Sequence, residues 1–138
     1  MFNLEKEKVL SIASNQGWFV GLNREEIIRL IELSRLTTYA ADDVVYTTGD
    51  KQKNLYCIIE GRIKVSIIGD QGGNFPLTMW EAGNWFGESA LHEDSVMPLQ
   101  ASAIAETMAL VIPIAVIDSA LDNAAIFYKN IVRDVIDR

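Results

Sequence analysis

Cysteine and histidine are scarce in this chain, and their scarcity excludes several kinds of chemistry. Cys57 is the only cysteine and His92 is the only histidine among 138 residues. No disulfide can form within the chain, and no zinc site built from several cysteines or histidines can be assembled. No set of residues pairs a nucleophile with its base, so no catalytic residues are assigned and no enzymatic activity is expected.

Basic residues and long apolar runs are also in short supply. The chain has 12 basic and 19 acidic side chains, which give a net charge of −7. This balance argues against direct binding of a nucleic acid or an anionic membrane. The N-terminus has neither a signal peptide nor the ~20-residue apolar run of a membrane helix. We therefore expect a cytoplasmic protein with no membrane partner, and any nucleic-acid-binding segment would lie outside this chain.

The order of the hydrophobic patterns predicts one α+β domain over residues 1–138 in which β-structure dominates. Residues 1–36 predict short helices, with Asn23 as a helix cap. Residues 37–113 carry β-branched and aromatic residues in seven or eight short runs, which predict a jelly roll, sandwich or small barrel. Residues 114–138 return to a helical pattern, and Asp122 and Asn123 are possible caps of its last segment.

One predicted strand shows its two faces directly in the sequence. In RIKVSII, residues 62–68, polar and apolar side chains alternate. Since successive side chains of a strand point to opposite faces, the alternation predicts a half-buried strand. The expected core side is Ile63, Val65 and Ile67, and the expected solvent side is Arg62, Lys64 and Ser66. The glycines that follow, in GDQGGN, predict a hairpin turn.

Two segments carry a resemblance to a known family: YTTGDKQKNLYCIIEGRIKVSI at 46–67 and EAGNWFGESAL at 81–91. They resemble the cyclic nucleotide-binding domain of the Crp/Fnr transcription regulators, the family of the catabolite activator protein. The resemblance runs from about Trp18 to the end of the chain. It implies a regulatory, ligand-sensing domain with a double-stranded β-helix of about eight strands, N-terminal helices and a C-terminal dimerisation helix.

The resemblance also implies a phosphate-binding cassette that begins at FGESAL, residues 86–91. In the family, a short helical turn aims backbone N–H groups at the cyclic phosphate, a glutamate binds the ribose, and an arginine about nine or ten residues later pairs with the phosphate. In this chain the arginine position falls on Met97, or on Pro98 or Leu99 if the loop is shifted. The ligand-binding residues that carry over are Gly87, Glu88, Ser89, Ala90, Met97, Pro98 and Leu99.

The cation that the cassette lacks is missing from a long stretch of the sequence. No Lys or Arg occurs between Lys64 and Lys129. A lost charge-assisted hydrogen bond corresponds to roughly 1.5–3 kcal/mol, or about one to two orders of magnitude in affinity. This disfavours cyclic AMP, and no cofactor is assigned. Three alternatives stay open: a basic residue from Arg62, Lys64 or a partner chain, a less anionic ligand, or an empty pocket with Glu88 as a simple cap.

Four other residues have an ordinary structural interpretation beside a functional one. His92 and the acidic residues 93–94 could suggest a metal or haem ligand. Adjacent residues on a short loop rarely converge on one ion, so we expect a solvated loop and no metal. Cys57 lies in an apolar run and is expected to be a buried hydrophobe. Trp80 and Trp85 are expected to pack beneath a loop rather than to hold a ligand.

The last helix is the second predicted functional element. Its apolar seam could pack back on the roll or against the same helix of a second chain, and we favour the homodimer. By resemblance, this helix leads to a helix-turn-helix domain that is absent from the chain and would supply DNA binding. The proposed dimer helix residues are Phe127, Tyr128, Ile131, Val132 and Val135.

The resemblance implies a two-state regulator whose small-molecule effector is unknown, with a hinge near Asp122 and Asn123. A ligand-free dimerisation module on the same fold is the alternative. A cupin-like metal enzyme would need several histidines, and the chain has one.

Overall fold

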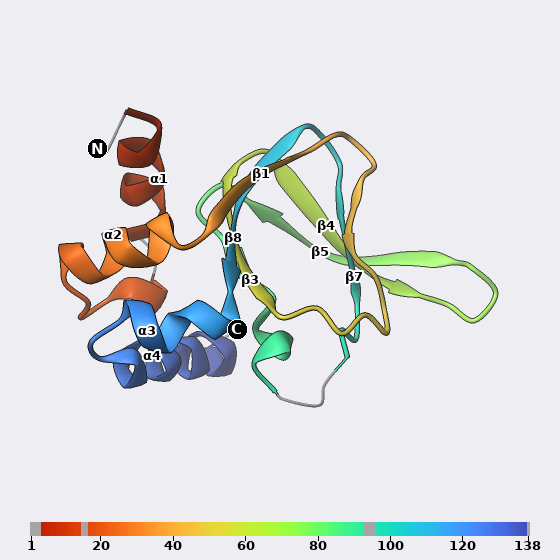
Figure 1. Cartoon of the computed structure of the whole chain (residues 1–138). Helices are drawn as coiled ribbons and strands as arrows, with labels where there is room; N and C mark the ends of the chain where they lie inside the picture. The colour runs from red at the N-terminus through yellow and green to blue at the C-terminus, as the bar shows by residue number, and fades with distance from the viewer. Residues whose placement is uncertain (1–3, 15–16, 93–95, 138) are drawn as a thin grey trace.

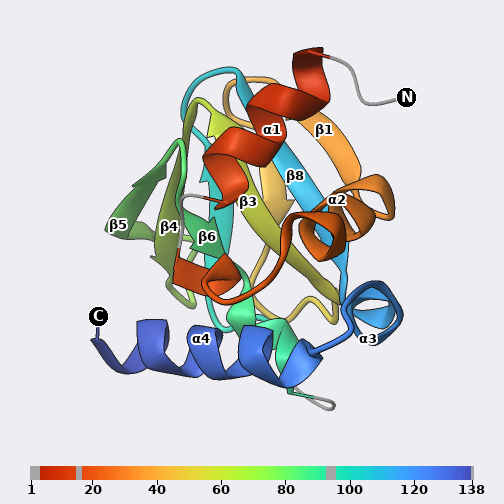
Figure 2. The same cartoon turned by 90° about the vertical axis from the view of Figure 1, so that its left-hand side faces the viewer.

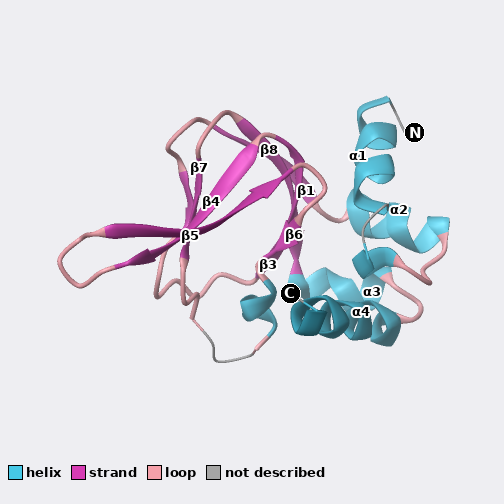
Figure 3. Ribbon diagram, turned by 180° about the vertical axis from the view of Figure 1, so that it is seen from behind, coloured by secondary structure: helices cyan, strands magenta, loops and turns pink. Residues whose placement is uncertain are grey.

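The computed structural model describes residues 4–14, 17–92 and 96–137 and places most of the helical segments on one side of a β-roll (Figures 1 and 3). Of the described helices, none is long and apolar enough to cross a membrane. The elements follow one another as α1 (Leu4–Ser14), η1 (Gly17–Phe19), α2 (Arg24–Glu32), β1 (Arg35–Tyr39), β2 (Val44–Tyr46), β3 (Asn54–Glu60), β4 (Arg62–Ile68), β5 (Asn74–Glu81), β6 (Trp85–Phe86), η2 (Glu88–Leu91), β7 (Gln100–Ala103), β8 (Thr107–Pro113), η3 (Ile114–Val116), α3 (Ile117–Ala120) and α4 (Ala124–Asp137).

The strands of the described residues form two four-stranded sheets, in the orders β1-β8-β3-β6 and β2-β7-β4-β5. All the strand pairs are antiparallel, and β1 pairs with β8 from Arg35 opposite Val111 to Tyr39 opposite Thr107. This architecture confirms the predicted α+β jelly roll with helices at both ends of the chain.

Strand β3 is buried on both of its faces. Leu55, Cys57 and Ile59 point into a core beneath the helices, whereas Tyr56 and Ile58 point into the roll. Figure 2 shows α1 and α2 crossing in front of β3 and β8. Because helices cover one face of β3 and the second sheet covers the other, its sequence is a continuous apolar run and not an alternating one.

Aromatic rings form the centre of the core beneath the helices. The ring centroids of Trp18 and Trp85 are 5.1 Å apart, and those of Phe19 and Trp85 are 4.8 Å apart. Phe127 of α4 joins them, with its ring centroid 5.8 Å from that of Phe19. Such pairs contribute about 0.5–1.5 kcal/mol each beyond the area that they bury. Phe19 of η1 therefore contacts both α4 and the roll, and links the C-terminal helix to the roll.

The predicted alternation in β4 holds only as far as Val65. Val65 pairs with Thr78, but the next residue, Ser66, pairs with Pro76, so Leu77 is an extra residue in β5. A bulge of this kind bends the strands and breaks the alternation. Ser66 was predicted to face solvent and is 0% exposed, whereas Ile67 was predicted to be buried and is 45% exposed. Beyond the bulge, the β4–β5 hairpin projects from the roll (Figure 1).

The start of α2 confirms the predicted cap. The Asn23 side chain accepts a hydrogen bond from the backbone N–H of Glu26 at 2.8 Å. The backbone N–H of Asn23 donates to Oε1 of Glu26 at 3.3 Å, which completes a reciprocal capping box. Two otherwise unpaired donors at the helix terminus are thereby satisfied.

The same Glu26 side chain also holds the turn before α4. Its Oε2 accepts hydrogen bonds from the backbone N–H groups of Asp122 at 3.0 Å and Asn123 at 3.2 Å. Arg29 adds an ion pair with Asp122 at 3.1 Å and donates from Nε to the carbonyl of Ala120 at 2.9 Å. One carboxylate, 5% exposed, therefore links the start of α2 to the start of α4.

We expect Glu26→Ala to lower the free energy of unfolding by about 2–4 kcal/mol, because it removes the acceptor of three backbone N–H groups at once. The matched control is Glu25→Ala on the exposed side of the same turn, with an expected loss below about 1 kcal/mol. Urea unfolding followed by circular dichroism measures both. Equal losses for the two variants would contradict the linking role of Glu26.

Candidate functional site

Gly87 sets the direction of the chain at the predicted cassette. Its backbone is left-handed, with φ of 96° and ψ of 10°, and the turn η2 follows at once. A Cβ at this position would lie 3.0 Å from Cδ2 of Tyr56 and 3.1 Å from the backbone oxygen of Asn54. Both the conformation and the close approach to β3 require glycine.

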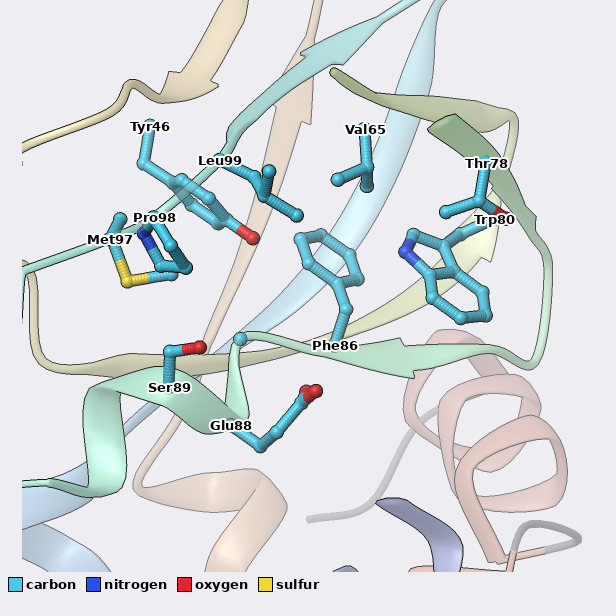
Figure 4. A pocket seen from close by; sticks show the side chains of 11 residues that line it. Tyr46, Val65, Thr78, Trp80, Phe86, Glu88, Ser89, Met97, Pro98 and Leu99 are labelled. Carbon is cyan, nitrogen blue, oxygen red and sulfur yellow. The ribbon is translucent and has the colours of Figure 1, made fainter. Parts of the chain in front are cut away.

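A pocket of about 110 Å³ lies between this turn and the roll (Figure 4). All the predicted ligand-binding residues except Ala90 line it, and Ala90 is instead buried in the core of the roll. The lining residues are Tyr46, Val65, Thr78, Trp80, Phe86, Gly87, Glu88, Ser89, Met97, Pro98 and Leu99.

Met97, at the expected arginine position, is held by its backbone on the pocket wall. Its N–H donates to the carbonyl of Asp50 at 2.8 Å, and its carbonyl accepts from the N–H of Gly49 at 2.8 Å. Its side chain is 2% exposed, and its Sδ lies 3.3 Å from Nε2 of Gln52. An apolar thioether therefore occupies the wall where the resemblance implies a guanidinium. Pro98 is exposed and Leu99 is half-buried beside it.

Neither Arg62 nor Lys64 lines the pocket as a substitute cation. Val65 and its cross-strand partner Thr78 both line it, whereas Lys64 is paired with Met79. Since neighbouring residues of a strand point to opposite faces, Lys64 and Arg62 belong to the outer face of this sheet. Among the described residues that line the pocket, Glu88 carries the single formal charge.

The tyrosines of the pocket region are neutral near physiological pH. Burial, followed by the negative charge of Glu88, raises the pKa of Tyr46 far above its ordinary value. Burial is also the largest cause that raises the pKa of Tyr56 to about 12. The hydroxyl of Tyr56 donates to Oε1 of Gln52 at 2.7 Å. Tyr46 therefore presents a neutral hydroxyl beside an acidic group.

Several pocket residues come from strands that the sequence did not associate with the cassette. The sequence assigns Tyr46 and Thr78 no role in the cassette, predicts Val65 as a core residue of its strand, and predicts Trp80 as a packing residue, yet all four line the pocket. Cross-strand pairing brings Val65 and Thr78 together, and that register follows from the bulge at residues 65–66. An alternation pattern marks which residues share a face but not which strands are neighbours.

The remaining predicted residues have structural surroundings. Trp85 packs against Trp18 and Phe19 in the core beneath the helices, as expected of a packing residue. Cys57 is fully buried, and burial strongly raises the pKa of its thiol. His92 is exposed, and its carbonyl accepts from Nζ of Lys53 at 3.1 Å. Within the described residues no group of three potential metal ligands comes together. The acidic neighbours of His92, at 93–94, lie outside the residues that the structure describes.

A two-sheet roll flanked by helices, with a left-handed glycine before a short turn and a pocket behind it, defines a class of ligand-binding β-roll domains. The family model of the cyclic nucleotide-binding domain matches residues 36–124, which is more than half of the chain. The chain therefore belongs to the cyclic nucleotide-binding domain family. This family is typically non-catalytic. No curated protein sequence matches the chain.

Solved structures of low sequence identity share the fold. The sensor domain of the transcriptional regulator DNR from Pseudomonas aeruginosa superposes with a TM-score of 0.82 at 15% identity, over 96% of this chain and 89% of that one. The Thermus thermophilus catabolite activator protein gives 0.79 at 20% identity, over 89% of this chain and 58% of its own. The regulatory domain of Toxoplasma gondii PKA with cAMP superposes with a TM-score of 0.78 at 19% identity, over 88% of this chain and 46% of that one. This chain thus spans about half the length of the last two.

Gly87→Ala is expected to lower the free energy of unfolding by about 2–4 kcal/mol, because the left-handed backbone and the contact with β3 both disfavour a side chain. Gly49→Ala is the matched control. Gly49 has φ of 92° and open space around a Cβ, so only the backbone cost of roughly 1–2 kcal/mol is expected there. Chemical unfolding of both variants gives the comparison, and an equal loss at the two glycines would refute the close approach.

Proposed function

We propose that residues 1–138 form a single regulatory sensor domain whose effector binds in the pocket behind Gly87. The observation that carries this proposal is the convergence of Glu88, Ser89 and Met97 on one pocket, with aromatic rings as its walls. A regulatory role agrees with the cyclic nucleotide-binding domain family, which is typically non-catalytic.

A chain of packed rings supports communication from the pocket to α4. Phe86 lines the pocket, and its neighbour Trp85 lies on the opposite face of the strand, in contact with Phe19. Phe19 in turn packs against Phe127 of α4. A ligand that shifts Phe86 would change the surroundings of Trp85 and hence the position of α4, provided that it binds two arrangements of these rings with different affinity.

The hinge of this regulator is the turn at Asp122 and Asn123. Both backbone N–H groups donate to Glu26, and Arg29 pairs with Asp122. In the proposed mechanism this contact holds α4 in the arrangement without ligand. Effector binding would shift the equilibrium toward an arrangement in which α4 and any domain that follows it are repositioned. Contact with DNA would require such a further domain, since this chain carries a net charge of −7.

The dimer helix is proposed in a narrower form than its sequence pattern indicated. Phe127 and Ile131 were predicted to face a second chain, but they are 0% and 2% exposed against the core of their own chain. Tyr128 donates to Oδ1 of Asp118 at 3.1 Å. The large apolar residues that α4 leaves exposed are Val132 at 58%, Val135 at 42% and Ile136 at 73%. We propose these three as the contact with a second copy.

The alternative function is a ligand-free dimerisation module on the same fold. The small volume of the pocket, about 110 Å³, favours this alternative, because drug-sized ligands occupy roughly 300–1,000 Å³. The two functions differ in whether any small molecule saturates the pocket, so a binding measurement separates them.

Met97→Arg is expected to raise the affinity for cyclic AMP at least tenfold, because it returns a guanidinium to the pocket wall beside the predicted phosphate position. Calorimetric titration compares it with the unsubstituted chain, for which we expect no saturation up to about 1 mM ligand. Val96→Arg is the matched control, since Val96 is adjacent in sequence and 42% exposed but does not line the pocket.

An equal gain for both arginine variants would indicate nonspecific attraction of the anion. No gain with arginine at residues 97, 98 or 99 would contradict an inherited nucleotide pocket.

For the dimer, we expect the double variant Val132→Asp/Val135→Asp to raise the dissociation constant at least tenfold, because each carboxylate would have to be desolvated in the helix contact. Sedimentation equilibrium measures the association. Val44→Asp is the control, because Val44 is a comparably exposed valine, at 52%, on β2. A monomeric unsubstituted chain, or the same loss from Val44→Asp, would contradict the proposal.

A further inference from the structure

We propose that the pocket behind Gly87 binds a small organic ammonium ion instead of a phosphate. This inference rests on the proposed function, since it names the chemical class of the effector for the same pocket. The argument uses the charge, the aromatic walls and the size of the pocket.

The charge of the pocket is negative. Glu88 is half-buried at its rim and is the single charged side chain among the described lining residues. Burial is the largest cause of the raised pKa of Tyr46, and the negative charge of Glu88 adds to it. The nearby cations Lys53 and Arg35 do not line the pocket, and the ammonium of Lys53 donates to the carbonyl of His92 at the end of η2. An anion would be repelled at this position, whereas a cation would be attracted.

The walls of the pocket suit a methylated cation. In Figure 4 the side chain of Glu88 extends from below, with Phe86 above it and Trp80 and Tyr46 on either side. A cation within about 6 Å of an aromatic face is attracted by the ring, and quaternary ammonium ions are commonly recognised by several such faces together. Leu99, Val65 and Met97 add apolar surface that methyl groups can contact.

The size and the polar groups of the pocket narrow the ligand further. A volume of about 110 Å³ is below the roughly 300 Å³ at which drug-sized ligand sites begin. Thr78 and Tyr46 also line the pocket, and their hydroxyls can hold one polar group. These features fit an ammonium head with a short hydroxyl-bearing tail better than a nucleotide.

Choline and its neutral carbon analogue 3,3-dimethylbutan-1-ol form a pair of probes with the same shape and different charge. Calorimetric titration of the unsubstituted protein is expected to give at least tenfold tighter binding of choline. Cyclic AMP and adenosine, titrated in parallel, test whether the pocket accepts an anionic nucleotide or a neutral nucleoside.

Two pocket variants and one control locate the effect. Glu88→Gln keeps the size of the side chain and is expected to weaken choline binding at least tenfold, with little change for the alcohol. Glu81→Gln is the matched control, because Glu81 is exposed and does not line the pocket. Glu81 lies at the end of β5, opposite Arg62 of β4. Trp80→Leu is expected to reduce the preference for choline over the alcohol about threefold, since leucine keeps apolar surface but loses the ring. Thermal unfolding verifies that each variant is folded.

The outcomes separate the inference from the proposed function. If choline binds more tightly than the alcohol, and this difference depends on Glu88 but not on Glu81, the result supports both the ammonium ligand and the proposed sensor function. Equal binding of choline and the alcohol, an unchanged choline affinity in Glu88→Gln, or binding of cyclic AMP or adenosine alone overturns the ammonium ligand and leaves a ligand-sensing pocket. Absence of binding by all four probes overturns the inference and favours the ligand-free dimerisation module.

Discussion

The burial of β3 on both faces is the constraint on which the rest of the structure depends. A strand with one solvated face would need only the second sheet to cover it, but Leu55, Cys57 and Ile59 require a second layer. The helices from both ends of the chain supply that layer. The same strand presents Tyr56 and Ile58 to the inside of the roll. Tyr56 stacks there on Phe86 of the pocket lining, with ring centroids 4.9 Å apart. Strand β3 therefore lies between the helical layer and the residues that support the pocket.

The adjoining strand β6 shares this division and continues directly into the site. Trp85 belongs to the helical core and Phe86 to the roll, and Gly87 then turns the chain so that Glu88 and η2 close the pocket. The fold keeps the turn whatever ligand it serves, because the turn depends on backbone conformation and on contact with β3. The charge of the pocket depends on side chains alone. The same scaffold can therefore carry pockets of different charge, and in this chain the charged side chain among the described lining residues is Glu88.

Glu26 gives the C-terminal helix a fixed starting point. The carboxylate closes the capping box of α2 and accepts from the two N–H groups before α4, so the N-terminal and C-terminal helices are positioned by one group. The aromatic contacts of Phe127 fix the next turn of α4. The large apolar residues that the helix leaves exposed are its later ones, Val132, Val135 and Ile136. The apolar surface that α4 exposes is accordingly set by how the helix packs on its own roll.

The sequence by itself determined the local features: the Asn23 cap, the short strands and the turns between them. Each depends on neighbours within a few residues, and such patterns can be read along the chain. The absence of Lys and Arg between residues 64 and 129 is likewise a property of the sequence alone. Apart from the predicted hairpin between β4 and β5, only the tertiary structure decided which strands meet. The bulge that buries Ser66, the convergence of Tyr46, Thr78 and Trp80 on the pocket, and the use of Phe127 and Ile131 in the chain's own core all depend on contacts between distant segments. An apolar stripe predicts that a face of a helix will be buried, but packing across the whole domain determines which surface buries it.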